Sequence, residues 1–105
     1  MEIEIGDVIA SRKLKVISGP DGGSIVEVLL GRPRPTPDAR DFLVPYLIKS
    51  TASEKRQCAV GIDEFQALQL ALKILDAELE AFERRNNLKL FWEGDDSGDL
   101  GFGRT

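Results

Sequence analysis

Three arginines in a proline-rich segment are the residues best suited to bind a small anion. Arg32, Arg34 and Arg40 lie within residues 31–41, which also carry three prolines. Guanidinium groups bind carboxylates and phosphates through paired N–H donors, and a stiff segment loses little entropy on binding. The pattern favours a site for a small anionic ligand, although two aspartates in the same segment are equally able to pair with these arginines.

The composition argues against catalysis, because none of the 105 residues is histidine. Histidine is the most common general base near neutral pH and the most common metal ligand. The single cysteine, Cys58, has no such partner and lies among strand-forming residues, so we interpret it as a buried structural thiol in a reducing compartment. We therefore expect no enzymatic activity, no catalytic residues and no cofactor.

An acidic cluster near residue 97 matches part of the ligand pattern of a calcium-binding loop. Asp95, Ser97 and Asp99 occupy the first, third and fifth ligand places, but Leu100 stands where an EF-hand loop needs glycine. We expect a solvated acidic turn and no metal site. Residues 94–105 then form a loosely ordered acidic and glycine-rich tail, unless Leu100 and Phe102 hold it against a sheet.

The stretch from Ile62 to Asn87 has the periodicity of an amphipathic helix. Asp63 is placed to cap its start with Gln66 as the return partner, and Asn86 or Asn87 can close its end. One apolar stripe is expected to pack on a sheet, although its spacing also suits a contact with a second protomer. The stripe comprises Phe65, Leu68, Leu72, Leu75, Leu79 and Phe82.

The rest of the chain alternates apolar and polar residues as strands do. Strands are expected over residues 1–5, 8–17, 25–30, 42–50, 57–61 and 88–92, with a hairpin turn at 18–23, an extended loop at 31–41 and another turn at 51–56. Pro45 cannot donate a ladder hydrogen bond, so residues 42–50 should form an edge strand or carry a bulge. We predict a single α+β domain over residues 1–105, with a mainly antiparallel sheet of about five strands packed on one long helix in β-β-β-β-α-β order.

Net charge and hydropathy argue against nucleic acid and membrane as partners. Residues 1–61 carry nine Lys and Arg against eight Asp and Glu, whereas residues 62–105 carry five against ten. Nucleic-acid binding requires positive charge to neutralise phosphates, so we expect no nucleic-acid partner. No apolar run approaches membrane-spanning length and the first residues are acidic, which indicates a cytoplasmic protein without a membrane partner. Tyr46 and Trp92 are interpreted as core residues.

These exclusions leave protein contacts as the favoured function. Asp76, Glu80 and Glu83 form an acidic face on the predicted helix that could hold a basic partner, such as a toxin that the protein neutralises. A solvated helix face is the alternative interpretation. Homodimerisation through the helix, or through an unpaired edge at residues 42–50, is compatible with either hypothesis.

Four segments together resemble a family of small uncharacterised bacterial proteins. They are Gly-Arg-Pro-Arg at 31–34, Pro-Tyr-Leu-Ile at 45–48, the helix segment 61–72 with its Gln-Ala-Leu-Gln-Leu-Ala-Leu run, and Gly-Asp-Leu-Gly-Phe at 98–102. The resemblance implies a bacterial source and a domain that stands alone. It implies no activity and no catalytic residues.

Overall fold

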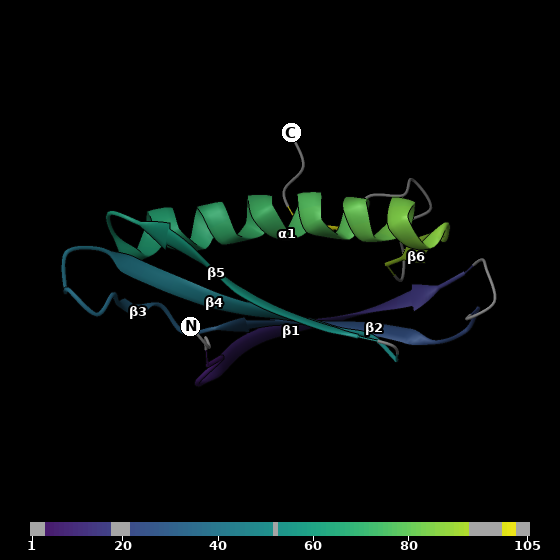
Figure 1. Cartoon of the computed structure of the whole chain (residues 1–105), viewed down its shortest axis with the longest axis horizontal. Coiled ribbons are helices and arrows are strands. Elements are labelled where there is room, and N and C mark those ends of the chain that lie inside the picture. The colour runs from purple at the N-terminus through teal and green to yellow at the C-terminus, as the bar shows by residue number, and fades with distance from the viewer. Residues whose placement is uncertain (1–3, 18–21, 52, 93–99, 103–105) are drawn as a thin grey trace.

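The computed structural model describes residues 4–17, 22–51, 53–92 and 100–102, in which one long helix lies across one face of a sheet (Figure 1). Every pair of neighbouring strands is antiparallel. The predicted α+β class is therefore confirmed, with six strands in the described part of the chain. The elements are β1 (Val8–Val16), β2 (Ile25–Gly31), β3 (Arg34–Pro35), β4 (Phe42–Lys49), β5 (Glu54–Gly61), α1 (Glu64–Asn86) and β6 (Leu90–Phe91).

The strands follow the order β5-β4-β2-β1-β6, and β3 pairs with β4 beyond the end of β2. β1 and β2 form the predicted hairpin with Lys15 opposite Ile25, although residues 18–21 of its turn lie outside the described residues. Residues 1–3 also lie outside them, and residues 4 and 5 are not in a strand. The loop predicted at 31–41 contains β3, whose two residues are too few to show an alternating pattern.

The position of β4 corrects one prediction. We expected an edge strand or a bulge because of Pro45, but β4 lies between β5 on one side and β2 and β3 on the other, and its register with β5 runs through Pro45 without a shift. The pairing with β2 covers residues 46–49 and the pairing with β3 covers residues 42–43. Pro45 therefore stands at the break between two ladders, where a residue without an N–H is tolerated. The free edge belongs instead to β5, which among the described residues pairs only with β4.

Both ends of α1 carry the caps expected from the sequence. The Asp63 carboxylate accepts a hydrogen bond of 2.7 Å from the Gln66 backbone N–H, and the Ile62 N–H donates to Gln66 Oε1 at 2.7 Å. Asn87 closes the helix in the left-handed conformation, with φ of 50°. These contacts satisfy backbone groups that the first and last turns leave unpaired.

The buried face of α1 differs from the predicted stripe. Leu75 and Leu79 are buried as expected, but Phe65 is 79% exposed and Leu72 is 37% exposed. The helix instead turns Ala67 and Ala71 fully into the core. Small side chains let the helix backbone approach the sheet closely, which moves the larger Phe65 to the side. A β-carbon on Gly61 would lie only 2.4 Å from the Ala67 backbone nitrogen.

The C-terminal part of the chain completes the core on the β1 side. Leu100 and Phe102 are buried, which confirms their predicted contact with the folded body. Arg12 Nη1 donates hydrogen bonds of 2.9 Å to the carbonyl oxygens of Leu100 and Gly101. The Arg12 guanidinium also lies 4.2 Å from the centroid of the Trp92 ring and 4.9 Å from that of Phe102. Residues 93–99 and 103–105, including the acidic cluster, lie outside the described residues.

Candidate functional site

The arginines proposed as an anion site make separate contacts. Arg32 Nε lies 3.7 Å from an Asp7 carboxylate oxygen, and Arg34 Nη2 donates to the Glu4 carbonyl oxygen at 3.0 Å. Both contacts join the segment after β2 to the chain that precedes β1. Arg40 has an exposed side chain, and the described residues offer it no ion pair. Anion binding at this segment stays a prediction. Of the three arginines, Arg40 is the one whose side chain is most available to a ligand.

Asp38, which the sequence offered as a pairing partner for these arginines, is used by its own turn. Its Oδ1 accepts hydrogen bonds from the Thr36 hydroxyl at 2.6 Å and from the Arg40 backbone N–H at 3.1 Å. These two donors stabilise the carboxylate and lower the pKa of Asp38 below its ordinary value. The Arg40 guanidinium therefore does not depend on Asp38 for its position.

The three acidic residues predicted as a contact face lie on one side of α1, but their roles differ. Glu80 is exposed and lies 3.6 Å from Arg84, an i,i+4 pair that contributes little to stability. Glu83 accepts a hydrogen bond of 2.8 Å from the Leu90 backbone N–H and so positions β6. Asp76 is half-buried. Of the three, Glu80 is thus the residue whose charge is most open to a partner.

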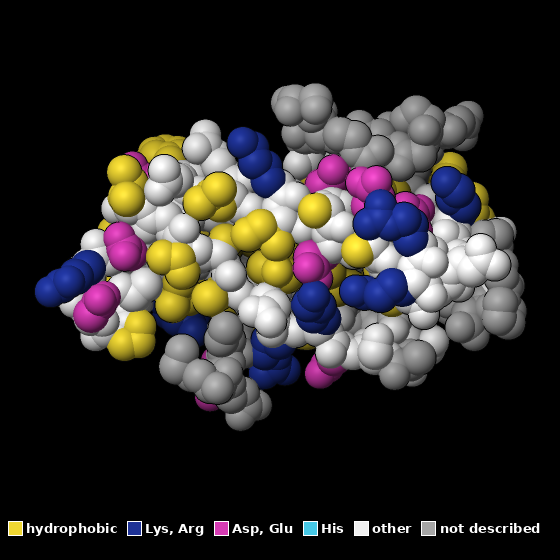
Figure 2. All heavy atoms as spheres, turned by 45° about the horizontal axis from the view of Figure 1, so that its top comes forward, with side chains coloured by type: hydrophobic (Ala, Val, Ile, Leu, Met, Phe, Trp, Pro, Cys, Tyr) yellow, Lys and Arg dark blue, Asp and Glu magenta, His cyan; other side chains and the backbone are white. Residues whose placement is uncertain are grey.

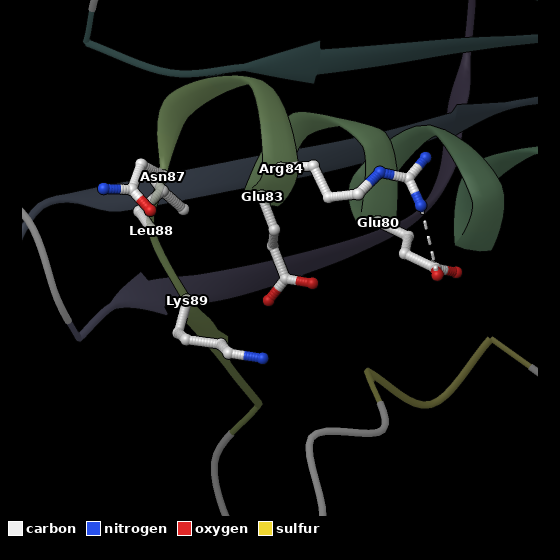
Figure 3. Close-up of a pocket in the computed structure, with 6 residues that line it drawn as sticks. All are labelled: Glu80, Glu83, Arg84, Asn87, Leu88 and Lys89. Atoms are coloured by element: carbon white, nitrogen blue, oxygen red, sulfur yellow. Dashed lines mark ion pairs between the residues drawn. The ribbon is translucent and has the colours of Figure 1, made fainter.

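Figure 3 shows the hollow beside this acidic group, where α1 ends and the chain turns toward β6. The side chains of Glu83 and Lys89 extend into the same space from these two segments, and Glu80 pairs with Arg84 at its rim. The hollow has a volume of about 360 Å³. Four charged side chains line the hollow, and the two acidic ones are matched by Arg84 and Lys89, so its surface is mixed in charge.

The same side of α1 carries two apolar side chains in its N-terminal half, Phe65 and Leu72, with the exposed Gln69 between them. Leu72 lies at the mouth of a cavity of about 130 Å³ between α1 and β1–β2, which Leu30 and Phe102 also line. Phe65 lies two turns earlier on this side, and spacings of three, four and seven residues place the acidic residues after it. We call this side the Phe65 flank. It comprises Phe65, Leu72, Asp76, Glu80 and Glu83.

The described residues show no group of side chains that could hold a metal ion. No three metal-ligating side chains of the His, Cys, Asp and Glu types gather within them. α1, their one helix, is too polar to cross a membrane. Tyr46, the side chain whose pKa is shifted most among the described residues, lies in the core between the sheet and α1, near the ion pair of Lys55 with Glu78. Burial first, and then the negative charges of Glu78 and Cys58, raise the pKa of Tyr46 to about 12.

This shift predicts how stability depends on alkaline pH. The chain has one tyrosine, so an absorbance titration of phenolate formation reports Tyr46 alone. We expect a midpoint near 12 in the folded protein, against 10.0 when it is unfolded. Because the neutral phenol is favoured by the fold, its contribution to stability is complete below pH 10 and is lost as pH rises through 12.

Tyr46→Phe should remove this part of the alkaline loss of stability. A phenolate midpoint near 10 in the native protein would contradict the buried environment of Tyr46.

The geometry thus defines a small α+β domain with an exposed apolar and acidic helix side. The chain belongs to the DUF6968 family, a domain of unknown function, whose model matches residues 10–104. No curated protein and no solved structure matches the chain. The family match agrees with the resemblance drawn from the sequence at the level of an uncharacterised family, and the bacterial source stays a prediction.

Proposed function

We propose that this domain is a non-enzymatic, cytoplasmic protein-interaction module that holds its partner with the Phe65 flank of α1. The observation that carries the proposal is the exposure of Phe65, together with 72% exposure of the neighbouring Ile62, beside a core that is already closed. Large apolar side chains that meet at a protein surface mark contact sites for other proteins.

The acidic half of the flank suggests the chemistry of the partner. An apolar anchor of the partner would cover Phe65 and Leu72, while Lys or Arg residues would approach Glu80. A basic protein that this domain neutralises, as antitoxins and immunity proteins do, has the required complementarity. Exposed charge pairs add mainly to the association rate and to specificity, so Phe65 should carry more of the affinity than Glu80.

The test compares what three immobilised variants retain from the native lysate. Phe65→Ala removes the apolar anchor and Glu80→Lys reverses the exposed charge, while Glu83 is left unchanged because it holds Leu90. Ile25→Ala is the matched control, since Ile25 is also exposed but lies in β2. We expect a stoichiometric protein that binds the wild type and the control and is lost from the other two. Equal retention by all variants would exclude the Phe65 flank.

The alternative is a small anionic ligand at the arginine segment, and the exposed, unpaired state of Arg40 among the described residues favours testing it. A ligand that binds only the native state raises the melting temperature. Phosphorylated and carboxylated metabolites should then raise it for the wild type and not for Arg40→Gln. A flat screen would count against this alternative and would leave the protein-contact proposal untouched.

A further inference from the structure

Within the described part of the chain, the outer edge of β5 pairs with no strand over its eight residues. In an antiparallel ladder a strand directs alternate N–H and C=O groups to each neighbour. The described residues place β4 on one side of β5 and no strand on the other. The edge contains no proline, and exposed edges of this kind readily pair with another strand.

The helix side above this edge is apolar throughout. Leu70, Ile74, Ala77 and Ala81 recur at spacings of four, three and four residues, which places them on one side of α1. Glu78, next to this side, pairs with Lys55 of β5, so this side lies above the β5 edge. Leu70 and Ile74 are half-buried against the core there, and Ala77 is exposed. In Figure 2 hydrophobic side chains gather left of centre, where α1 lies above β5, and charged ones gather toward the C-terminal end of α1. We call these four residues the β5 flank.

We propose that the β5 edge and the β5 flank bind the same surface of a second copy of this chain around a two-fold axis. The two β5 strands would pair antiparallel and join both sheets into one, while the two α1 helices pack antiparallel above them. A symmetric contact of this type requires a surface that complements itself. Both the strand layer and the helix layer of this surface can match their own copies.

The helices complement each other in size. If the two-fold axis passes between Leu75 and Asp76, Leu70 lies opposite Ala81 of the second copy, and Ile74 lies opposite its Ala77. A large side chain then meets a small one at each of four places along the contact. Alternating large and small residues allow two helices to pack closely without voids.

One register of the strands avoids contacts between like charges. A two-fold axis at Lys55 or Arg56 would place that residue opposite its own copy, and like charges directly opposite one another destabilise a pair of strands. An axis at Gln57 avoids this, because each charged residue then faces an uncharged one. The pairs would be Glu54 with Val60, Lys55 with Ala59, and Arg56 with Cys58.

The two-fold axis required by the strands and the one required by the helices lie close together in the folded chain. Gly61 lies against Ala67 and Lys55 pairs with Glu78, so these contacts fix how β5 runs beneath α1. Gln57 stands one third of the way from Lys55 to Gly61 along β5. The same fraction of the way from Glu78 to Ala67 along α1 falls near Ile74. The strand axis and the helix axis therefore agree to within about one helical turn, roughly 5 Å. The Phe65 flank lies on the other side of each helix and stays accessible, so the dimer does not depend on the proposed function.

Mass measurement in solution is the first test. We expect twice the 11.6 kDa of the chain at micromolar concentration, and a monomer for Ala77→Glu, which places a charge at the centre of the β5 flank. Gln69→Glu is the matched control, since Gln69 is also exposed on α1 but lies outside this flank. Circular dichroism should show the same helix content for both variants. A monomer for the wild type, or a dimer that Ala77→Glu leaves intact, would overturn the proposal.

A disulfide tests the strand register. In a Cys58→Ser background, Gln57→Cys would face its own copy at a Cα separation of about 4.5–5.5 Å, which is within disulfide range. We expect rapid oxidation to a covalent dimer, and none for Lys13→Cys in the same background, because Lys13 lies in β1 away from the β5 edge. No enrichment of the cross-link over the control would exclude pairing about Gln57.

Discussion

Leu79→Ala should lower the free energy of unfolding by about 2–5 kcal/mol, the range for buried leucines truncated to alanine. Leu79 has 0% of its surface exposed, and it lies in the core between α1 and the sheet. Removing the isobutyl group leaves a cavity that the surrounding strands cannot fill without moving. Chemical denaturation followed by circular dichroism measures the change.

Leu72→Ala provides the matched control on the same helix. The side chain is chemically identical, but 37% of the Leu72 surface is exposed, so the substitution removes fewer buried contacts. We expect a loss of about 1 kcal/mol, the central value for single substitutions. Equal losses for the two variants would show that α1 does not bury the side assigned to it here.

Gly61→Ala should destabilise the fold by about 3 kcal/mol or more, because overpacking forces backbone to move. The new β-carbon would lie 2.4 Å from the Ala67 backbone nitrogen and 2.9 Å from its Cα. Neither atom belongs to a flexible side chain, so either α1 must lift from β5 or the strand must shift. A thermal melt of the variant measures the effect.

Gly23→Ala separates this steric effect from backbone strain. Gly23 has a φ of 91°, which alanine adopts poorly, but a β-carbon there would meet nothing within 4 Å. Strain alone should cost about 1–2 kcal/mol. If Gly61→Ala proved no worse than Gly23→Ala, the close approach of α1 to β5 would be wrong.

The elements that the sequence predicted best are those with local signals. Asp63, Gln66 and Asn87 mark the ends of α1 within a few residues, and β1 and β2, the strands predicted on either side of residues 18–23, pair as a hairpin. The rest depends on contacts between distant segments. Proline removes a donor, so Pro45 predicts an edge strand or a bulge, and only the arrangement of β2 and β3 along β4 shows that neither is needed.

The candidate site was predictable only in part, for a similar reason. Spacing alone placed Asp76, Glu80 and Glu83 on one side of a helix. It could not show that Glu83 accepts a hydrogen bond from Leu90, because this contact depends on where the strand predicted at 88–92 lies relative to α1. Phe65 fitted the apolar stripe as well as Leu75 did, since both share its period. The deciding factor was the small size of Ala67 and Ala71, which set how close the helix lies to the sheet.

The contact between Arg12 and the carbonyl oxygen of Leu100 spans 88 residues of sequence, and this separation has a consequence for synthesis on the ribosome. β1 precedes α1 in the chain, yet Leu100 and Phe102, which are buried on the β1 side, follow α1. Contacts of large sequence separation form late, and apolar surface exposed meanwhile promotes aggregation. The hairpin of β1 and β2 therefore stays partly uncovered until residues 100–102 have been synthesised and can pack, and apolar surface of the nascent chain is exposed during this interval.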